Sequence, residues 1–241
     1  MKLRLDKFLA NSGIGSRKEV NHLIAEGHVH VNGKVIVAGK TKIEETDAVT
    51  VDETILSYRK YRYYMMNKPV DALSATRDHR TTVIDFIRDE DQVPDLFPVG
   101  RLDKDTTGLL LITNDGRLAH ELLSPKHHVQ KGYEALLDDD VTEEDRQAFQ
   151  KGFFLEPEKI WTMPAELQIL DTKKALVHIM EGKYHQVKRM FALRGKKVLQ
   201  LKRISMGTLR LDPRLAYGEY RELTKEELDT LRGLVRKTTV N

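Results

Sequence analysis

The sequence contains no cysteine, which excludes disulfide bonds, thiolate metal sites and cysteine nucleophiles and is compatible with a reducing cytoplasm. It also has no apolar run close to the roughly 18 residues that span a bilayer. The first six residues lack the apolar core of a signal peptide. We therefore expect a soluble, cytoplasmic protein that does not enter a membrane.

Acidic side chains are absent from residues 182–210, although that stretch contains nine lysines and arginines. The whole chain has a net charge of only +3, so the total charge does not require a polyanionic partner. A long stretch of one sign is typical of a surface that contacts a phosphate backbone. The alternative is a basic face that meets only solvent.

The N-terminal region is predicted to begin with two short helices. Apolar residues recur at helical spacing from Leu5 and stop at Ser12 and Gly13. Ser16, followed three residues later by Glu19, forms a capping-box pattern that predicts the start of a second helix.

A hairpin is expected after the second helix, which should end at Gly27. Valines alternate with polar residues on both sides of Asn32-Gly33, a strong signal for a two-residue hairpin turn. Further short strands are expected near residues 43 and 49–51. We predict a separate N-terminal domain over residues 1–58 and a second domain over residues 59–241.

The second domain is predicted to mix strands and helices without regular alternation, which favours an α+β fold with a mixed or mostly antiparallel sheet. The segment from Ser57 to Tyr64 is interpreted as its first strand, with tyrosines on one face. Residues 108–113 form an apolar run that predicts a strand buried on both faces. Other strands are predicted at 133–137, 165–170 and 175–180, and helices after Gly116, at 142–150 and at 224–235.

Asp103 lies in a candidate functional loop just before the predicted buried strand. In an extended segment Arg101 and Asp103 leave the same face while Leu102 points to the core. Glycines at positions 100 and 108 allow a tight loop. An isolated aspartate at such a place is more often a turn former or a helix cap.

A second candidate segment, residues 181–195, combines basic residues with an amphipathic helix that Gly195 should end. On a helical wheel Lys188 lies at the edge of the apolar stripe, and Arg189 lies nearly opposite it. Lys188 is therefore better placed to reach a partly buried carboxylate, and Arg189 to meet solvent or phosphate. The alternative is an ordinary amphipathic helix whose basic side chains extend to solvent. Val187, Met190, Phe191 and Arg194 lie at helical spacing, and the first three are apolar.

Several segments, in order along the chain, resemble the motifs of the pseudouridine synthases. The resemblance rests on Asn67-Lys68-Pro69, Gly100-Arg101-Leu102-Asp103-x-x-Thr106-x-Gly108-Leu109-Leu110, Lys131-Gly132-Tyr133, His185-Gln186-Val187-Lys188 and Leu201-Lys202-Arg203-Ile204-Ser205-Met206-Gly207. The N-terminal region resembles an S4 RNA-binding domain in Arg4-Leu5-Asp6-Lys7, Ser16-Arg17 and Gly27-x-Val29-x-Val31-Asn32-Gly33. The run from Tyr184 to Met190 resembles the branch that modifies small-subunit (16S) ribosomal RNA, the RsuA type, more than the large-subunit branch.

The resemblance implies roles for the matching residues. Asp103 matches the essential aspartate, Tyr133 the tyrosine that stacks on the target base, and Lys188 the basic residue that pairs with the aspartate. Lys188 stands where many relatives have arginine, so a single ammonium group replaces a guanidinium that could donate two parallel hydrogen bonds to the carboxylate. Arg101 matches the arginine that fills the gap left by a flipped nucleotide. Leu201 and Arg203 match the last motif, whose residues shape the pocket and support it. The whole group expected to contact the substrate or RNA comprises Arg101, Leu201, Arg203, Arg189, Arg4, Lys7, Arg17 and Lys18.

The implied reaction breaks the N1–C1′ bond of a uridine and joins the sugar to C5, so it needs no ATP, redox cofactor or metal. The aspartate could attack the base, attack the sugar or remove the C2′ proton. The expected partner is 16S ribosomal RNA or a small-subunit assembly intermediate, and nothing requires more than a monomer. Alternatives are an enzyme acting on 23S RNA, a non-catalytic S4-type RNA-binding or assembly protein, and a metal hydrolase using Asp138–Asp140 or His127–His128.

Overall fold

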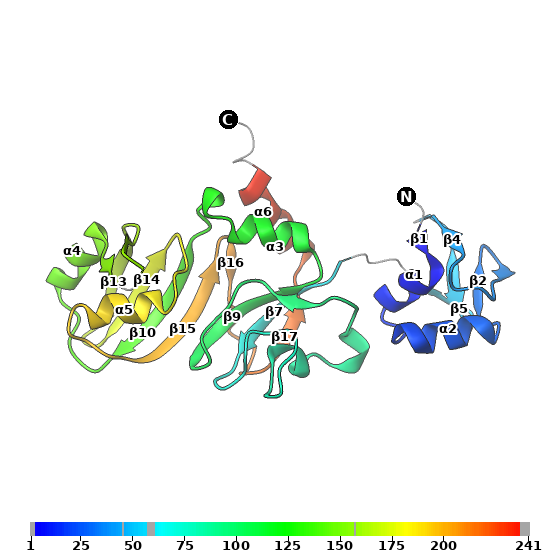
Figure 1. Cartoon of the computed structure of the whole chain (residues 1–241), viewed down its shortest axis with the longest axis horizontal. Coiled ribbons are helices and arrows are strands. Elements are labelled where there is room, and N and C mark those ends of the chain that lie inside the picture. The colour runs from blue at the N-terminus through cyan, green and yellow to red at the C-terminus, as the bar shows by residue number, and fades with distance from the viewer. Residues whose placement is uncertain (1–2, 45, 57–60, 157, 237–241) are drawn as a thin grey trace. The chain divides into compact units, whose positions relative to one another are not determined.

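The computed structural model describes residues 3–44, 46–56, 61–156 and 158–236, and the chain divides into two compact units (Figure 1). One unit comprises Met1–Arg62, Ile87–Phe97 and Thr113–Asp115. The other comprises Tyr63–Phe86, Pro98–Ile112 and Gly116–Asn241. The predicted domain boundary near residue 58 lies outside the described residues, as does the first half of the segment expected to lead into the second domain.

Two helices open the first unit, as predicted. Helix α1 (Leu5–Asn11) is followed by α2 (Arg17–Ala25). The hydroxyl of Ser16 accepts a hydrogen bond from the backbone N–H of Glu19, and the Glu19 carboxylate accepts one from the N–H of Ser16. This capping box satisfies donors that the first turn of α2 leaves unpaired. Gly27, with φ of +83°, follows the helix in the left-handed region.

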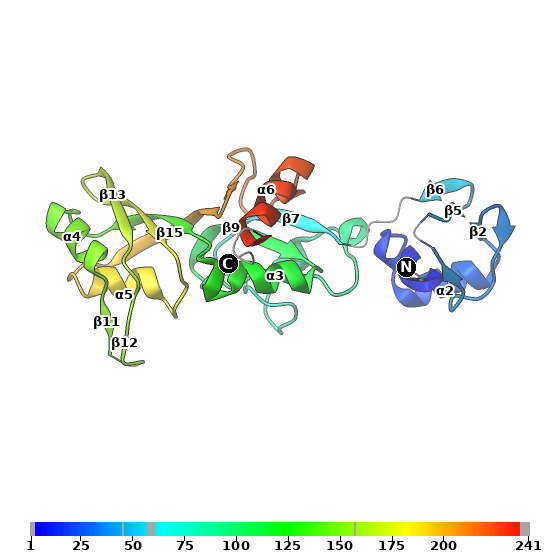
Figure 2. The same cartoon turned by 90° about the horizontal axis from the view of Figure 1, so that it is seen from above.

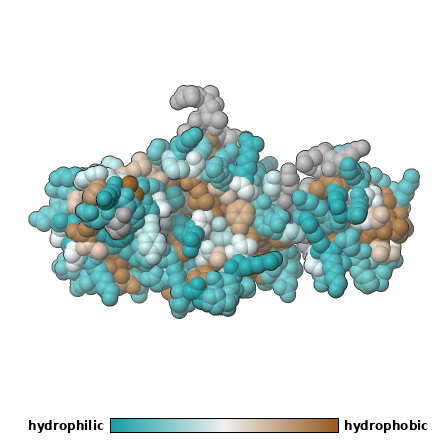
Figure 3. Space-filling view, viewed as in Figure 1, coloured by the Kyte–Doolittle hydropathy of each residue, from teal (hydrophilic) through white to brown (hydrophobic). Residues whose placement is uncertain are grey.

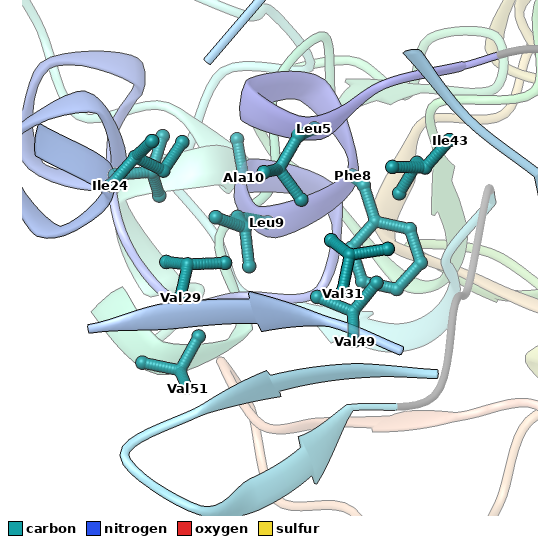
Figure 4. Packing of buried hydrophobic residues seen from close by; sticks show 11 residues of the cluster. Leu5, Phe8, Leu9, Ala10, Ile24, Val29, Val31, Ile43, Val49 and Val51 are labelled. Atoms are coloured by element: carbon teal, nitrogen blue, oxygen red, sulfur yellow. The ribbon is translucent and has the colours of Figure 1, made fainter. Parts of the chain in front are cut away.

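An antiparallel sheet completes the first unit, in the strand order β3-β2-β5-β6, and β1 pairs separately with β4. The predicted turn at Asn32-Gly33 has positive φ at both residues, as a tight hairpin requires. Side chains from both helices and the sheet form one apolar core (Figure 4). The strands are β1 (Leu3–Arg4), β2 (Val29–Val31), β3 (Lys34–Val35), β4 (Lys42–Ile43), β5 (Val49–Val51) and β6 (Thr54–Leu56).

The second unit is built on a mixed sheet with the strand order β13-β14-β10-β15-β9-β7-β17, to which β16 and β8 add at β15 and β9. Strands β15 and β9 are parallel, whereas β10 is antiparallel to both of its neighbours. The α+β prediction with a mixed, mostly antiparallel sheet is confirmed. The strands are β7 (Tyr63–Lys68), β8 (Phe97–Pro98), β9 (Thr106–Thr113), β10 (Lys131–Leu137), β11 (Phe154–Leu155), β12 (Ile160–Trp161), β13 (Glu166–Asp171), β14 (Lys174–Ile179), β15 (Val198–Met206), β16 (Leu209–Arg210) and β17 (Tyr220–Glu222).

Strand β9 is the buried strand predicted from its apolar run, and it begins two residues earlier, at Thr106. Its pairing with β15 depends on Gly108, where φ is +99° and an added Cβ would lie 2.2 Å from the carbonyl oxygen of Arg203. Gly108 therefore permits close approach of two backbones within the sheet, rather than shaping the loop before it.

Strand β7 departs from the prediction that its tyrosines share one face. Tyr63 and Tyr64 are successive residues of the strand, so they point to opposite faces, and both are buried. All six residues of the strand are buried, and it lies inside the sheet, between β9 and β17.

Helices flank this sheet in two groups (Figures 1 and 2). Helix α4 packs beside β13 and α5 beside β15, whereas α3 and α6 contact each other near the other end of the sheet. None of the helices in the described residues is both long and apolar enough to cross a membrane. On the face shown in Figure 3, hydrophilic residues predominate and hydrophobic ones form small patches. The helices are α3 (Gly116–Leu123), α4 (Glu143–Lys151), α5 (Gln186–Ala192) and α6 (Lys225–Arg236), with short 3-10 turns at Val83–Phe86, Asp89–Asp91 and Pro125–His127.

Candidate active site

Asp103 lies in the loop that leads into β9, with 27% of its side chain exposed. Arg101 is exposed and Leu102 is buried, so the predicted division of this loop into an outer and an inner face is confirmed. Gly100, with φ of +76°, supplies the turn into the loop.

Lys68, at the end of β7, supports the loop from inside the unit. Its side chain is fully buried, and its ammonium donates to the carbonyl oxygens of Pro69, Lys104 and Thr106 at 2.9, 3.2 and 2.9 Å. Burial lowers the pKa of Lys68 to about 8, although the negative charges of Asp105 and Asp103 oppose that change. A buried cation therefore fixes the backbone on both sides of Asp105.

Ser74 fixes the other part of the same loop. Its hydroxyl donates to the carbonyl oxygen of Leu102 and accepts from the Leu102 N–H, both at 3.0 Å. Both backbone groups of the residue before Asp103 are thus satisfied by one side chain. The carboxylate is presented from a backbone with little freedom to move.

Lys188, on α5, forms the ion pair with Asp103 that the helical wheel and the resemblance predicted. Its Nζ lies 3.0 Å from Oδ2 of Asp103 and 2.5 Å from Oδ1 of Asp105. Burial disfavours the charged form of Lys188, but the hydrogen bonds and charges of Asp105 and Asp103 outweigh it and raise the pKa of the ammonium. The hydrogen bond from Lys188 lowers the pKa of Asp105.

His185 is a further neighbour of Asp103, with Nε2 3.5 Å from Oδ1. It precedes α5 in the left-handed conformation, with φ of 49° and ψ of 31°. A non-glycine residue in that region costs on the order of 1–3 kcal/mol and persists only where its surroundings fix it. Its ring stacks on that of Tyr184, with centroids 3.8 Å apart.

A pocket of about 410 Å³, including space open to solvent, adjoins Asp103. Tyr133 on β10 and Leu201 on β15 contribute to its wall, and both are largely buried. The structure therefore brings together Arg101, Asp103, Tyr133 and Leu201, as the sequence predicted, and Lys188 contacts the carboxylate. The lining residues are Arg101, Leu102, Asp103, Thr106, Tyr133, Ile179, Gly182, Lys183, His185, Gln186, Val187 and Leu201.

Arg203 is not among the lining residues. Its side chain is buried, and Nε donates to the carbonyl oxygen of Leu109 at 2.7 Å. Arg203 sits opposite Tyr133 in the β10–β15 pairing. It therefore supports the sheet beneath the pocket, and the grouping of this residue with RNA-contacting side chains is corrected by its burial.

The helical wheel predicted that Arg189 would meet solvent or phosphate. In the structure its guanidinium is instead occupied by partners within the same unit. Its guanidinium pairs with both carboxylate oxygens of Glu158, at 2.9 and 2.7 Å, and also donates to the carbonyl of Tyr184 at 3.1 Å. Only 22% of its side chain is exposed. The wheel treats α5 as isolated, whereas Glu158, which lies between β11 and β12 in the sequence, contacts its outer side.

The basic residues predicted to bind RNA in the first unit lie on and beside its helices. Lys7, Arg17 and Lys18 are exposed, and Arg4 is half exposed in a pair with the largely buried Asp6. The hydrogen bond from Arg4 lowers the pKa of Asp6, and the positive charge of Arg17 adds to this effect.

The residues that suggested a metal hydrolase have structural roles where the structure shows their partners. Asp138–Asp140 precede α4, whose N-cap is Thr142. The buried Asp145 completes the capping box with Thr142 and binds Arg194 and Lys196 at 2.8 and 2.7 Å. Asp138 accepts from the N–H of Lys197. Within the described part of the chain, no three His, Asp or Glu side chains are grouped as metal ligands require.

Three residues of the site had no role in the sequence-based prediction. Lys68 and His185 belong to segments that resemble family motifs, but no role was predicted for either residue. Asp105 lies in the same loop as Asp103 and was likewise given no role. The spacing Asp103-x-Asp105 was a usable signal, because alternate residues of an extended loop share a face. Burial of Lys68 and the backbone conformation of His185 depend on the tertiary structure.

Comparison with known proteins agrees with this arrangement. Residues 62–193 match the RNA pseudouridylate synthase family and residues 3–49 match the S4 domain. An uncharacterised RNA pseudouridine synthase of Bacillus subtilis is 49% identical and covers 95% of this chain and 98% of its own length. Ribosomal small subunit pseudouridine synthase A of Vibrio cholerae is 41% identical, with 95% and 99% covered.

A solved structure described as a pseudouridylate synthase is 39% identical, has a TM-score of 0.67, and covers 95% of this chain and 99% of its own. The family match over residues 62–193 includes the loop that bears Asp103. The chain therefore belongs to the RsuA-type family and is an RNA pseudouridine synthase with an N-terminal S4 domain.

Proposed function

We propose that this enzyme converts a specific uridine of 16S ribosomal RNA to pseudouridine, with Asp103 as the catalytic carboxylate. The observation that carries the proposal is the contact of Asp103 with Lys188 at the edge of a pocket walled by Tyr133. A charged, oriented carboxylate beside a flat aromatic surface suits a reaction that detaches a base and turns it.

The reaction exchanges one glycosidic bond for another. The N1–C1′ bond breaks, the uracil rotates, C5 bonds to C1′, and the proton that C5 loses is balanced by the proton that N1 gains. An attack on the base, an attack on the sugar and removal of the C2′ proton each require a carboxylate at one fixed place. The position of the Asp103 carboxylate is fixed by its contact with Lys188, and the backbone of the loop is fixed by Ser74 and Lys68.

Three of the lining residues, Tyr133, Leu201 and Arg101, have roles beside that of Asp103 in this proposal. Tyr133 stacks on the uracil and Leu201 shapes the pocket. A base in folded RNA must first be extruded, at a cost of a few kcal/mol. Arg101, exposed at the pocket, occupies the gap that the extruded nucleotide leaves. Because that position is open to solvent, its guanidinium can enter the RNA without first leaving a buried site.

Binding of the RNA backbone offsets the cost of extrusion. We assign this role to the exposed cations Lys7, Arg17 and Lys18 of the S4 domain, and to Lys197 and Arg210, the exposed cations of the basic stretch 182–210. Arg4 has a smaller part, because Asp6 already pairs with it. Arg189 contributes less than a free guanidinium would, because Glu158 already neutralises it.

The small-subunit RNA is favoured as substrate by relatives whose names specify the ribosomal small subunit. They include the proteins from Vibrio cholerae and Pasteurella multocida, 41% and 42% identical over 95% of this chain. The name of the Bacillus subtilis relative specifies no substrate. A test must therefore offer both ribosomal RNAs.

The experiment incubates the protein with unmodified transcripts of 16S and 23S RNA and with small-subunit assembly intermediates, then maps pseudouridine by a chemical stop assay. We expect one new site, in 16S RNA or in the particle. A site in 23S RNA alone would refute the substrate assignment but leave the reaction intact. Specific binding to both transcripts and particles without any pseudouridine would favour a non-catalytic assembly protein.

A further inference from the structure

Two aromatic rings form an exposed stack at the rim of the pocket. The rings of Tyr184 and His185 lie 3.8 Å apart with 19° between their planes. Tyr184 is 71% exposed, so the face of its ring that does not meet His185 is open to solvent. A large exposed aromatic beside a catalytic pocket gains little from the core and is available to a ligand.

The segment that carries the stack is held firmly by its neighbours. The carbonyl of Tyr184 accepts from Arg189, which Glu158 anchors through two hydrogen bonds. The side chain of Gln186 accepts from the N–H of Lys183 and donates to Glu181, each at 2.9 Å. These hydrogen bonds fix the turn before α5 that carries the two rings.

His185 connects the stack to the reacting centre. Its left-handed backbone turns the imidazole so that Nε2 faces Oδ1 of Asp103 at 3.5 Å, while the ring plane covers Tyr184. A ligand stacked on Tyr184 would thus lie next to the nucleotide that reaches Asp103. The strained backbone at His185 is explained if it serves this placement.

We propose that Tyr184 and His185 form a stacking platform for an unpaired RNA base that neighbours the extruded uridine. The inference rests on RNA as the substrate, and deepens the proposed function by naming what the rim of the site binds. Extrusion of one nucleotide leaves a neighbouring base without its stacking partner. Aromatic side chains bind such bases through their faces, with little dependence on base identity.

The platform makes Tyr184 a determinant of substrate binding, and Asp103 chemistry does not require its ring. Loss of a base–aromatic stack weakens binding by roughly tenfold. We expect Tyr184→Ala to raise KM about tenfold with kcat within about twofold of wild type, and Tyr184→Phe to behave as wild type. Tyr217, 60% exposed elsewhere in the same unit, provides a matched control, and Tyr217→Ala should leave KM unchanged.

The decisive experiment pairs these variants with altered RNA. A fragment is prepared around whichever uridine the wild-type enzyme modifies in either ribosomal RNA, so failure of the 16S assignment does not affect the test. Single abasic sites are then placed at each flanking position. We expect one position at which the abasic site raises the KM of wild type and Tyr184→Phe about tenfold but leaves that of Tyr184→Ala unchanged.

Two results would overturn the platform. One is an equal response of wild type and Tyr184→Ala at every abasic position, which would show that Tyr184 meets no base. The other is a loss in Tyr184→Ala confined to kcat, or matched by Tyr217→Ala. In each case the wild-type enzyme still forms pseudouridine, so the proposed reaction is judged separately.

Discussion

Nζ of Lys188 lies 3.0 Å from Oδ2 of Asp103, although 85 positions separate the two residues in the sequence. The parallel pairing of β9 with β15 explains how they meet. Asp103 precedes β9, and α5, which carries Lys188, precedes β15 and packs beside it. Parallel strands begin at the same edge of a sheet, so the segments before them converge there.

Replacement of Lys188 by methionine should lower kcat more than RNA affinity, because the residue orients the carboxylate rather than binding phosphate. A hydrogen bond between charged groups contributes about 1.5–3 kcal/mol, so we expect a fall in kcat of about ten- to a hundredfold. Lys188→Arg should keep most of the activity, since the charge remains. Single-turnover rates and filter-binding affinities measure the two effects, and a tenfold loss of affinity at unchanged kcat would count against an orienting role.

Lys68 should make stability depend on pH above neutrality. Its pKa is about 8 in the folded chain, against the ordinary lysine value of 10.5 in the unfolded chain, so the unfolded chain binds more protons between those values. The free energy of unfolding therefore rises with pH across that window and is insensitive to this group below it. Burial also lowers the pKa of Lys131 to about 8, so this residue makes a similar contribution to the rise of the unfolding free energy with pH.

In Lys68→Met one of these two contributions is absent. Between pH 7 and pH 9.5 the free energy of unfolding of wild type should rise by about 2 kcal/mol more than that of the variant, as measured by urea unfolding. Lys131→Met retains Lys68, and its free energy of unfolding should also rise less with pH than that of wild type, by a similar amount. Parallel stability curves for wild type and Lys68→Met over this range would contradict the lowered pKa.

Glu158 should weaken the interaction of Arg189 with RNA. Because Glu158 pairs bidentately with the guanidinium, Glu158→Gln removes the neutralising charge from Arg189 and keeps an amide oxygen that can accept from it, so the support of Tyr184 is retained. We expect tighter RNA binding at low salt and a steeper dependence of log K on log salt, by up to about 0.7–0.9 for one additional phosphate contact. Titrations at several salt concentrations test this, with Arg189→Ala as the comparison. A salt slope unaltered by Glu158→Gln would show that Arg189 lies away from the phosphates.

The elements that the sequence predicted well are those with local signals. The capping box at Ser16, the turn at Asn32-Gly33 and the apolar run of β9 each depend on neighbouring residues, and each is present. The meeting of Asp103 and Lys188 required the resemblance to known motifs as well as the helical wheel. Neither local patterns nor a wheel contains the contacts between distant elements.

Those distant contacts explain the errors. Arg189 was expected to meet solvent or phosphate, but Glu158, which lies between β11 and β12 in the sequence, pairs with it. Arg203 was grouped with substrate- and RNA-binding residues because it lies in a segment that resembles a family motif, but the close β9–β15 pairing buries it against the carbonyl of Leu109. In both cases a residue outside the local segment determines what the charge contacts.

Asp103 and Asp105 offer the most direct test of the central claim, because they share one loop and one partner, Lys188. Asp103 is at the pocket, whereas 76% of the Asp105 side chain is exposed. The measurement is the single-turnover rate of pseudouridine formation by Asp103→Asn and Asp105→Asn on the same RNA. We expect no detectable product from the first and a rate within about threefold of wild type from the second. Product from Asp103→Asn at the wild-type rate would contradict the assignment of Asp103 as the catalytic carboxylate.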